Sequence, residues 1–338
     1  MSCAAEDLTP LTTLRLPARA RQRRDVTSRP ALLAALAEAR ASKLPVVPLG
    51  EGSNVVLAGD VEALVLRYRG RGRRVLAADD DGALLRVAAG ENWHALVRWT
   101  LDAGFSGLEN LALIPGTVGA APIQNIGAYG VELAPFVAAV HAVTIADGEA
   151  LTLSAAECRF GYRDSVFKGP LRDAVVITDI DLRLPHRGAP ATTYPSLRAH
   201  LEAHGIAASA GSVFDAVVAL RRARLPDPAQ VPNAGSFFKN PVVDEGQARA
   251  LRQRYPAMPQ FPAAAGRKLA AGWLIEHCGW KGARCDGVGV HREHALVLIN
   301  ERGTGAALLA LAERIRASVA ATFGCELEIE PRVYGGAP

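Results

Sequence analysis

Residues 114–130, IPGTVGAAPIQNIGAYG, constrain the fold of this chain more than any other segment. These seventeen residues contain four glycines, two prolines and three alanines. Such a composition packs poorly in a regular helix or strand, because glycine has no side chain to pack and proline lacks a backbone donor. It suits a backbone that passes close to a large flat ligand and its pyrophosphate. The alternative is an irregular loop with a structural role only.

A second glycine-rich turn lies in residues 48–57, PLGEGSNVVL, between two expected strands. Gly50 and Gly52 lack Cβ atoms, so backbone N–H groups there can converge on an anion, and Ser53 and Asn54 add side-chain donors. The turn is not a dinucleotide-binding fingerprint, because the third glycine is missing and a strand follows. Alone it is a weak signal, since small turns between strands are common.

Two further segments hold polar residues that could do chemistry. In VPNAGSFFKN (231–240), Ser236 stands on a small-residue bend before two phenylalanines and a lysine. This indicates either a hydroxyl held against an apolar wall or a loop that the phenylalanines anchor to a core. In CRFGYRDSVFK (158–168), Arg163 offers a planar fork suited to a carboxylate. A surface loop with an arginine–aspartate pair is the alternative there.

The composition is that of an ordinary globular protein. The chain has 338 residues, enough for two or three domains, with 49% hydrophobic and 21% charged residues. A net charge of +4 and a pI of about 8.9 do not indicate nucleic-acid binding. We expect the two basic clusters, 21–24 and 67–74, to be solvated loops.

No export or membrane segment is visible. The start, MSCAAEDLTPL, lacks the basic and apolar regions of a signal peptide, and no run approaches 18 apolar residues. Five widely spread cysteines, including Cys3, are expected to be reduced thiols in the cytoplasm. The spacing of Cys278, Cys285, His291 and His294 does not match usual zinc sites, so we expect no metal.

The hydrophobic pattern predicts an α+β chain. Helices are expected over 30–40, 92–105, 266–279 and 305–324, in the later part of 186–205, and from 212 until Pro226. Strands are expected over 44–50, 55–58, 63–68, 83–90, 137–153, 174–184, 294–300 and 325–335. Residues 1–185 and 206–326 thus form two α+β regions, joined by a connector.

Seven segments, in this order, resemble one family: PLGEGSN, IPGTVGAAPIQNIGAYG, FGYRDSVFK, PNAGSFFKNP, KLAAGWLIEHCGWKG, HALVLIN and ELEIEPRVYG resemble the UDP-N-acetylenolpyruvoylglucosamine reductases. The resemblance runs from about residue 10 to residue 336. It implies an α+β, three-domain flavoprotein with FAD-binding domains of the vanillyl-alcohol-oxidase type. The domains would be 1–70 with 327–338 (FAD-binding), 71–205 (FAD-binding) and 206–326 (an α+β substrate domain). Thr193-Tyr194-Pro195 suggests the subtype with a tyrosine loop over the substrate.

The resemblance also implies an activity. These enzymes use NADPH and noncovalent FAD to reduce UDP-N-acetylglucosamine enolpyruvate to UDP-N-acetylmuramate in peptidoglycan precursor synthesis, which supports cell-wall biogenesis, cell shape and cell division. A monomer is expected, with a UDP-sugar as partner and with neither nucleic acid nor membrane. Two alternatives stay open: another FAD-dependent oxidoreductase of this fold, and a non-catalytic nucleotide-sugar binder.

Site residues follow from the same resemblance. Arg163 would bind the substrate carboxylate, Ser236 would deliver a proton, and Glu330 would assist at the enolate. Glu326, Glu328 and Glu330 are expected to face one side of the last strand, so Glu328 is the alternative to Glu330. The cofactor would contact Gly50, Glu51, Gly52, Ser53, Asn54, Ile114, Pro115, Gly116, Gly119, Ala120, Ala121, Ile123, Asn125, Gly127, Ile177 and Arg332. The substrate would contact Tyr129, Tyr194, Arg224 (where lysine is usual), Lys239, Asn240, Lys281 and His294.

Overall fold

The computed structural model describes residues 5–336, so Cys3 and the extreme ends of the first expected domain lie outside it. The chain folds into two compact units. Among the described residues, the first contains 5–6, Ala20–Glu51 and Glu62–Ala223, and the second contains Asp7–Arg19, Gly52–Val61 and 224–336. This two-unit division does not separate the two expected FAD-binding subdomains, so the three-domain division stays a prediction.

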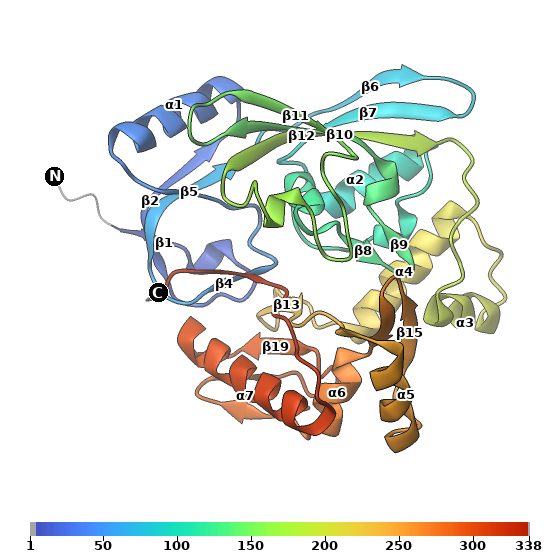
Figure 1. The fold of residues 1–338 in the computed structure, drawn as a ribbon. Helices are drawn as coiled ribbons and strands as arrows, with labels where there is room; N and C mark the ends of the chain where they lie inside the picture. Colours follow the sequence, from blue (N-terminus) through green and yellow to red (C-terminus); the bar gives the residue numbers. More distant parts are fainter. Residues whose placement is uncertain (1–4, 337–338) are drawn as a thin grey trace. The chain divides into compact units, whose positions relative to one another are not determined.

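A five-stranded antiparallel sheet organises the first unit, in the order β11-β10-β12-β7-β6 (Figure 1). Its strands are β6 (Arg73–Ala78), β7 (Gly82–Ala88), β10 (Val137–Thr144), β11 (Ala150–Ser154) and β12 (Val175–Pro185). Alternate residues of β12, Ile180, Leu182 and Leu184, are completely buried and so mark the core face. Helix α2 (Trp93–Asp102) buries Trp93, Leu96 and Val97 in the same core, as its spacing predicted.

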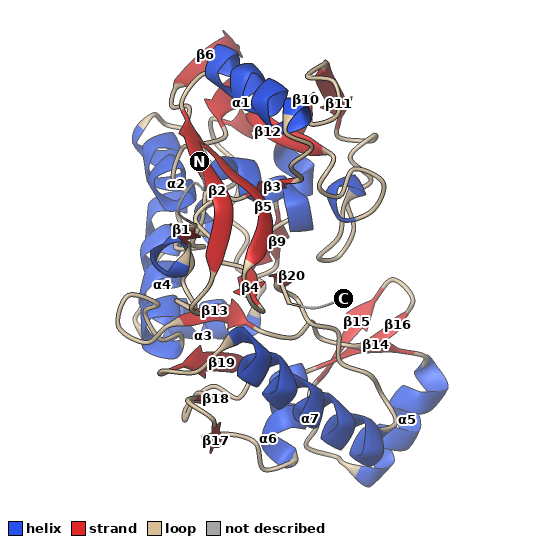
Figure 2. Cartoon of the chain, turned by 90° about the vertical axis from the view of Figure 1, so that its left-hand side faces the viewer, coloured by secondary structure: helices blue, strands red, loops and turns tan. Residues whose placement is uncertain are grey.

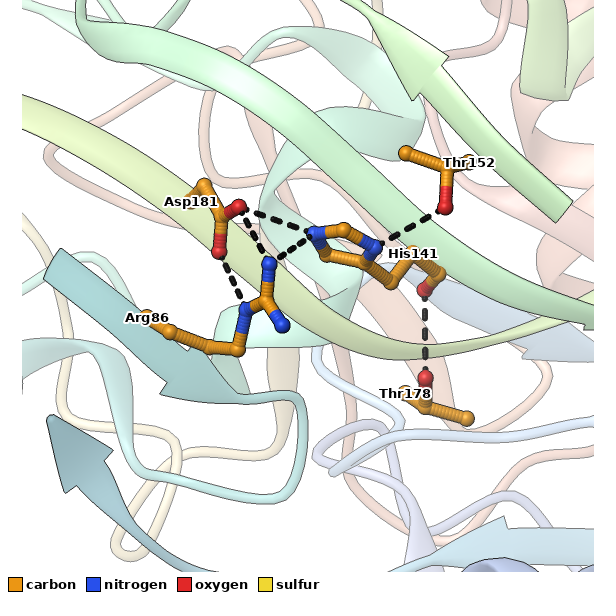
Figure 3. Close-up of polar contacts among 5 residues, drawn as sticks. All are labelled: Arg86, His141, Thr152, Thr178 and Asp181. Carbon is orange, nitrogen blue, oxygen red and sulfur yellow. Dashed lines mark hydrogen bonds and ion pairs between the residues drawn. The ribbon is translucent and has the colours of Figure 1, made fainter. Parts of the chain in front are cut away.

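The opposite face of this sheet carries a polar cluster (Figure 3). Arg86 on β7 donates two hydrogen bonds to the Asp181 carboxylate on β12, each at 2.7 Å. His141 Nε2 lies 2.9 Å from Asp181, and its Nδ1 lies 3.1 Å from the Thr152 hydroxyl. Burial raises the pKa of Asp181, but the hydrogen bonds from Arg86 and His141 outweigh it, so the net pKa lies below its ordinary value. The cluster therefore joins four adjacent strands.

A second sheet has the order β1-β2-β5-β3, and Figure 2 shows β2 and β5 side by side. Its strands are β1 (Glu6–Asp7), β2 (Arg19–Val26), β3 (Val46–Pro48) and β5 (Val61–Tyr68), with α1 (Arg29–Ala41) following β2. The expectation that 21–24 forms a solvated loop was wrong, because these residues lie within β2. For 67–74 it was right only in part, since 69–72 is the loop between β5 and β6 while both ends belong to those strands. Where the expectation failed, strand pairing overrides the polar composition.

The remaining elements of the first unit are short. They are the 3-10 segments Glu109–Leu111, Val118–Gln124, Ala134–Phe136 and Val166–Lys168, the hairpin of β8 (Gly127–Ala128) and β9 (Val131–Glu132), and helix α3 (Pro195–Ala203). A further 3-10 segment, Thr9–Leu11, belongs to the second unit, and helix α4 (Ala210–Arg224) ends at the boundary between the two.

The second unit contains three small sheets and three helices among the described residues. One sheet is β13 (Asn233–Ser236), β19 (Val297–Asn300), β18 (Val288–Val290) and β17 (Arg284–Cys285). Another is β14 (Val242–Val243), β16 (Gly266–Leu269) and β15 (Gln260–Ala263). The third pairs β4 (Val55–Leu57) with β20 (Arg332–Tyr334) in parallel. The helices are α5 (Glu245–Arg254), α6 (Ala271–His277) and α7 (Gly305–Phe323).

Two expectations for this unit were wrong. Residues 266–279 are not one helix, because Gly266–Leu269 pairs as β16 with β14 and β15 before α6 begins at Ala271. Residues 325–335 are not one strand. Only Arg332–Tyr334 pairs regularly, and Ile329 forms an isolated bridge with Phe238. Pro331 between them has no N–H for a sheet ladder.

Candidate functional site

The two glycine-rich segments meet in the first unit. A Cβ on Gly50 would lie 2.9 Å from Thr117 Oγ1 and 3.6 Å from Ala120 Cβ, so the turn approaches segment 114–130 more closely than a larger residue allows. Arg67 Nε donates to the Gly50 carbonyl at 3.3 Å and supports the turn from the sheet. The structure therefore brings together two of the segments that the sequence assigned to the cofactor.

Segment 114–130 is irregular, as its composition predicted, and it is tied to the main sheet. Its centre is a 3-10 helix, Val118–Gln124. The Gly119 N–H donates to the Ala89 carbonyl at 2.8 Å, and the Ala89 N–H donates to the Thr178 carbonyl on β12 at 2.8 Å. A Cβ on Gly119 would lie 2.6 Å from Ala89 Cβ, so glycine is needed for this approach.

The exposure of this segment fits a flat ligand. Ile114, Gly119, Ala120, Ile123 and Gly127 are partly exposed, which leaves small and apolar groups accessible for contact. Gly116, Ala121 and Ile177 are buried. These residues fit the flat ring and phosphates of a flavin nucleotide, which need close backbone approach and few bulky side chains.

Asn125 is the exception among the expected cofactor residues. Its backbone is left-handed, with φ of 44°, and its side chain is buried. Its Nδ2 donates to Glu132 at 2.8 Å and to the Gly161 carbonyl at 3.1 Å, and its Oδ1 accepts from the Ala134 N–H. The side chain is thus engaged in holding the loop itself.

The rest of the first glycine turn belongs to the second unit. Gly52 has φ of +60°, and a Cβ there would lie 2.3 Å from the Leu11 carbonyl oxygen, so only glycine fits. The Arg332 N–H donates to the Asn54 carbonyl at 2.9 Å beside the β4–β20 pair. Gly52, Asn54 and Arg332, all predicted to contact the cofactor, therefore lie together.

Arg163 reaches the end of segment 114–130. Its Nη2 donates to the Gly127 carbonyl at 2.7 Å, and its own carbonyl accepts from Lys168 Nζ at 3.0 Å. Ser165 Oγ donates to the Ile123 carbonyl at 2.6 Å, which ties the arginine loop to the same segment. The predicted carboxylate-binding cation thus lies beside the predicted cofactor loop.

Two tyrosines line this region. The rings of Tyr129 and Tyr194 contact edge to face, with centroids 5.3 Å apart. Asn110, which is buried, donates to the Tyr129 carbonyl at 3.0 Å and to the Ala191 carbonyl at 2.8 Å. The tyrosine loop is therefore held against the end of segment 114–130, and the two predicted substrate tyrosines are brought together.

Ser236 lies at the end of β13 in the second unit, opposite Val297. The preceding Gly235 has φ of +69°, and its N–H donates to the buried Asn233 Oδ1 at 2.8 Å. Phe237 and Phe238 are both buried and pack edge to face. The phenylalanines thus anchor the bend to the core, and Ser236 beside them in the chain is partly exposed.

The two candidate glutamates have different surroundings. The Glu330 N–H donates to the Phe237 carbonyl at 2.9 Å, so its backbone lies beside the residue that follows Ser236. The Glu328 carboxylate is exposed and lies 2.5 Å from Lys239 Nζ in an ion pair. Although 325–330 is not a regular strand, Cys325 and Leu327 are buried while Glu326 and Glu328 are exposed, so the predicted alternation holds over 325–328.

The remaining substrate candidates lie in the second unit. Asn240 Oδ1 accepts from the Ala271 N–H at 2.9 Å, at the start of α6, and Lys281 pairs with Glu276 at 2.8 Å. His294 Nδ1 is buried and has no hydrogen-bond partner among residues 5–336. Burial lowers the pKa of His294, and the nearby His291, Arg224 and Lys281 lower it further. Arg224, Lys281 and His294 are therefore neighbours.

Sequence analysis missed Asn110 and Arg221. Asn110 gave no signal, because its role depends on carbonyls that are distant in sequence. Arg221 is one of three arginines in four residues, RRAR, a pattern typical of a solvated helix face. Nothing in that pattern distinguishes Arg221, which packs near Tyr129 and Arg163, from the exposed Arg222.

The described residues, 5–336, contain no helix that is long and apolar enough to cross a membrane. Within the same range, no three His, Cys, Asp or Glu side chains are grouped so that they could hold a metal ion.

Comparisons with known proteins agree with this geometry. Residues 24–154 match an FAD binding domain, and residues 227–334 match the C-terminal domain of UDP-N-acetylenolpyruvoylglucosamine reductase. The chain is 51% identical to such a reductase from Paraburkholderia phymatum over 96% of this chain and 95% of the relative. It is 52% identical to one from Burkholderia multivorans over 94% and 93%. The crystal structure of the Thermus caldophilus reductase is similar at 27% identity, with a TM-score of 0.65, over 98% and 99% of the two chains.

Proposed function

The chain belongs to the UDP-N-acetylenolpyruvoylglucosamine reductase family, and from that premise we propose how its residues carry out the reaction. The protein is an FAD-dependent oxidoreductase that reduces the enol ether of UDP-N-acetylglucosamine enolpyruvate to the lactyl ether of UDP-N-acetylmuramate. NADPH is the proposed reductant.

The reaction places three demands on the protein. Bound FAD would supply hydride-transfer chemistry for the alkene, with NADPH as the proposed source of the hydride. Negative charge then develops next to the substrate carboxylate, and the adjacent carbon needs a proton. The site must therefore provide a cation for the carboxylate, stabilisation of the developing enolate, and an acid.

Arg163 is the proposed cation. Its guanidinium is held by the Gly127 carbonyl at the end of the cofactor segment, which supports a position beside the reacting carbons. A planar guanidinium can bind both oxygens of a carboxylate, which orients the alkene as well as balancing its charge.

Ser236 is the proposed proton donor. A serine hydroxyl is a poor acid in water and can act only on a strongly basic carbanion in a dry, preorganised site. The buried Phe237 and Phe238, together with the Asn233 contact that holds the bend, support such a setting.

Glu330 is favoured over Glu328 as the third catalytic residue. Its backbone is bonded to the Phe237 carbonyl, one residue from Ser236, and its side chain is partly buried. Glu328 is exposed and paired with Lys239, so its carboxylate is already engaged. The contact between Glu330 and Phe237 is the single observation that carries the catalytic assignment.

The cofactor and substrate assignments remain part of this proposal. Gly50, Gly52, Asn54, segment 114–130 and Arg332 are the proposed contacts of noncovalent FAD. Tyr129 and Tyr194, with the group of Arg224, Lys281 and His294, would hold the UDP-sugar, along with Lys239 and Asn240. A cytoplasmic monomer without nucleic-acid partners stays a prediction.

Product analysis tests this proposal. The purified protein is mixed with UDP-N-acetylglucosamine enolpyruvate and NADPH, and UDP-N-acetylmuramate is sought by mass spectrometry, with NADH in a parallel reaction. Binding of the substrate without turnover would favour a nucleotide-sugar binder. A flavin that NADPH reduces but the enolpyruvyl sugar never reoxidises would favour another oxidoreductase of this fold.

A further inference from the structure

Arg221 on α4 carries a cation that the protein does not neutralise. Among residues 5–336 it makes no hydrogen bond and no ion pair, and its Nε atom is buried without a partner. Two other partly buried arginines of the first unit each bind a carboxylate. Arg86 binds Asp181 at 2.7 Å and Arg73 binds Glu91 at 2.6 Å. Arg221 therefore differs from both of these arginines.

The groups near Arg221 increase the free-energy cost of burying its charge. Burial lowers the pKa of Arg221, the nearby Tyr129 raises it, and the Arg163 guanidinium lowers it further. Two cations thus lie near each other, and no carboxylate contributes to the balance among the described residues. Removing an unpaired charge from water costs several kcal/mol, and a like charge adds to that cost. An arrangement of this kind becomes favourable when an anion binds between the two cations.

The residues around Arg221 also indicate which bound molecule would carry such an anion. Tyr129 contacts the Tyr194 ring edge to face, and Asn110 binds both the Tyr129 and the Ala191 carbonyls. Arg221 is therefore near Tyr129, whose ring contacts the tyrosine loop, and near the predicted carboxylate cation. The proposed UDP-sugar carries anionic oxygens of both kinds, a carboxylate and a diphosphate.

We propose that Arg221 is a substrate-binding residue whose guanidinium, beside that of Arg163, binds anionic oxygens of the UDP-sugar. The inference rests on the proposed function and adds a residue to it. It also explains why an unpaired cation is kept on α4 with its Nε buried, since perturbed and unpaired charges concentrate at functional sites.

Three variants of the full-length holoprotein test the inference. Arg221→Met removes the charge and keeps most of the stem, and Arg221→Lys keeps the charge without the fork. Arg222→Met is the matched control, because Arg222 is the next residue and is exposed. Dissociation constants are measured by calorimetry for UDP-N-acetylglucosamine, for its enolpyruvyl ether and for NADP⁺. Unfolding temperatures are measured without nucleotide sugar.

We expect Arg221→Met to bind the enolpyruvyl sugar about 10- to 100-fold more weakly, the loss expected for a charge-assisted hydrogen bond. Lysine should restore part of the affinity, and Arg222→Met should bind like the wild type. Because Arg221→Met removes an unpaired charge, its unfolding temperature without the sugar should equal or exceed that of the wild type. A purely structural arginine would give a lower unfolding temperature with unchanged affinity.

The two nucleotide sugars separate the possible anions. Equal loss for both sugars would assign Arg221 to the diphosphate, and loss for the enolpyruvyl sugar alone would assign it to the carboxylate. Wild-type affinity for both sugars in Arg221→Met, or a loss confined to NADP⁺, would overturn the inference while leaving the proposed function intact. Wild-type protein that binds neither sugar would refute both. Should the Met variant not fold, Arg221→Gln takes its place with the same outcomes.

Discussion

Replacing Ser236 with alanine separates acid catalysis from every other role of the bend. The substitution removes one oxygen, and alanine accepts the extended backbone of β13. The groups that hold the bend are untouched, since Asn233 binds the Gly235 N–H and the Phe237 N–H donates to the Leu296 carbonyl. The cofactor segments lie elsewhere in the chain, so bound flavin should be retained.

The structure sets the expected magnitudes. Within residues 5–336 the Ser236 hydroxyl makes no hydrogen bond, so its loss should change the free energy of unfolding by no more than about 0.5 kcal/mol. Loss of a general acid should slow the proton-requiring half-reaction by roughly 10²–10⁴-fold. At about 1.36 kcal/mol per tenfold, this is about 2.7–5.4 kcal/mol of activation free energy. The kinetic effect should therefore exceed the stability effect several-fold.

Anaerobic stopped-flow spectroscopy measures the two half-reactions separately. Flavin absorbance should disappear with NADPH at the wild-type rate, because that half needs no proton from Ser236, and should return far more slowly with the enolpyruvyl sugar. Ser42→Ala, the same change at the exposed end of α1, is the control and should leave both rates unchanged. Equally fast return of absorbance in Ser236→Ala would refute the assignment of Ser236 as the acid. Slowing of both halves together would place the residue in the flavin site instead.

Three further predictions concern the cofactor, the tyrosine loop and acid stability. Denaturation should release free FAD, because neither glycine-rich segment contains a His or Cys that could form a covalent link; flavin that stays on the denatured chain would contradict this. Tyr194→Phe should raise the Michaelis constant for the UDP-sugar more than it lowers turnover, which steady-state kinetics will show; an unchanged constant would make the loop a plain linker. Asp181 has a lowered pKa in the folded protein, so its stabilising effect is present above its ordinary pKa and is lost as the pH falls through the lower, folded value. Asp181→Asn should therefore cost about 1–3 kcal/mol at pH 7 and lessen the loss of stability as the pH falls below the ordinary pKa of aspartate, and an unfolding curve with unchanged acid sensitivity would count against it.

Much of the fold follows from local sequence. The apolar spacing of 305–323 and the glycine after it predicted helix α7, and Gly324 indeed ends it with φ of +65°. The composition of 114–130 predicted an irregular backbone, and the structure has a 3-10 helix and left-handed residues there. These predictions succeed because they depend on side chains within one or two turns of each other.

The errors share one cause. Residues 266–269 continue a helical pattern, yet they form β16 because two strands elsewhere in the chain pair with them. The basic residues of 21–24 look solvated, yet their backbone belongs to β2. Strand pairing is a long-range interaction, so a local pattern does not contain it.

The order and spacing of the motifs, read from the sequence by itself, determined the family and the identity of Arg163, Ser236 and Glu330 as candidates. Only the tertiary structure decided how residues of the same type that are close in sequence differ in burial and in bonding partners. It buries the Nε of Arg221 near Arg163 while Arg222 is exposed, and it pairs Glu328 with Lys239 while bonding Glu330 to Phe237. Chemically identical side chains acquire different surroundings and partners because burial and pairing come from segments far away in the chain.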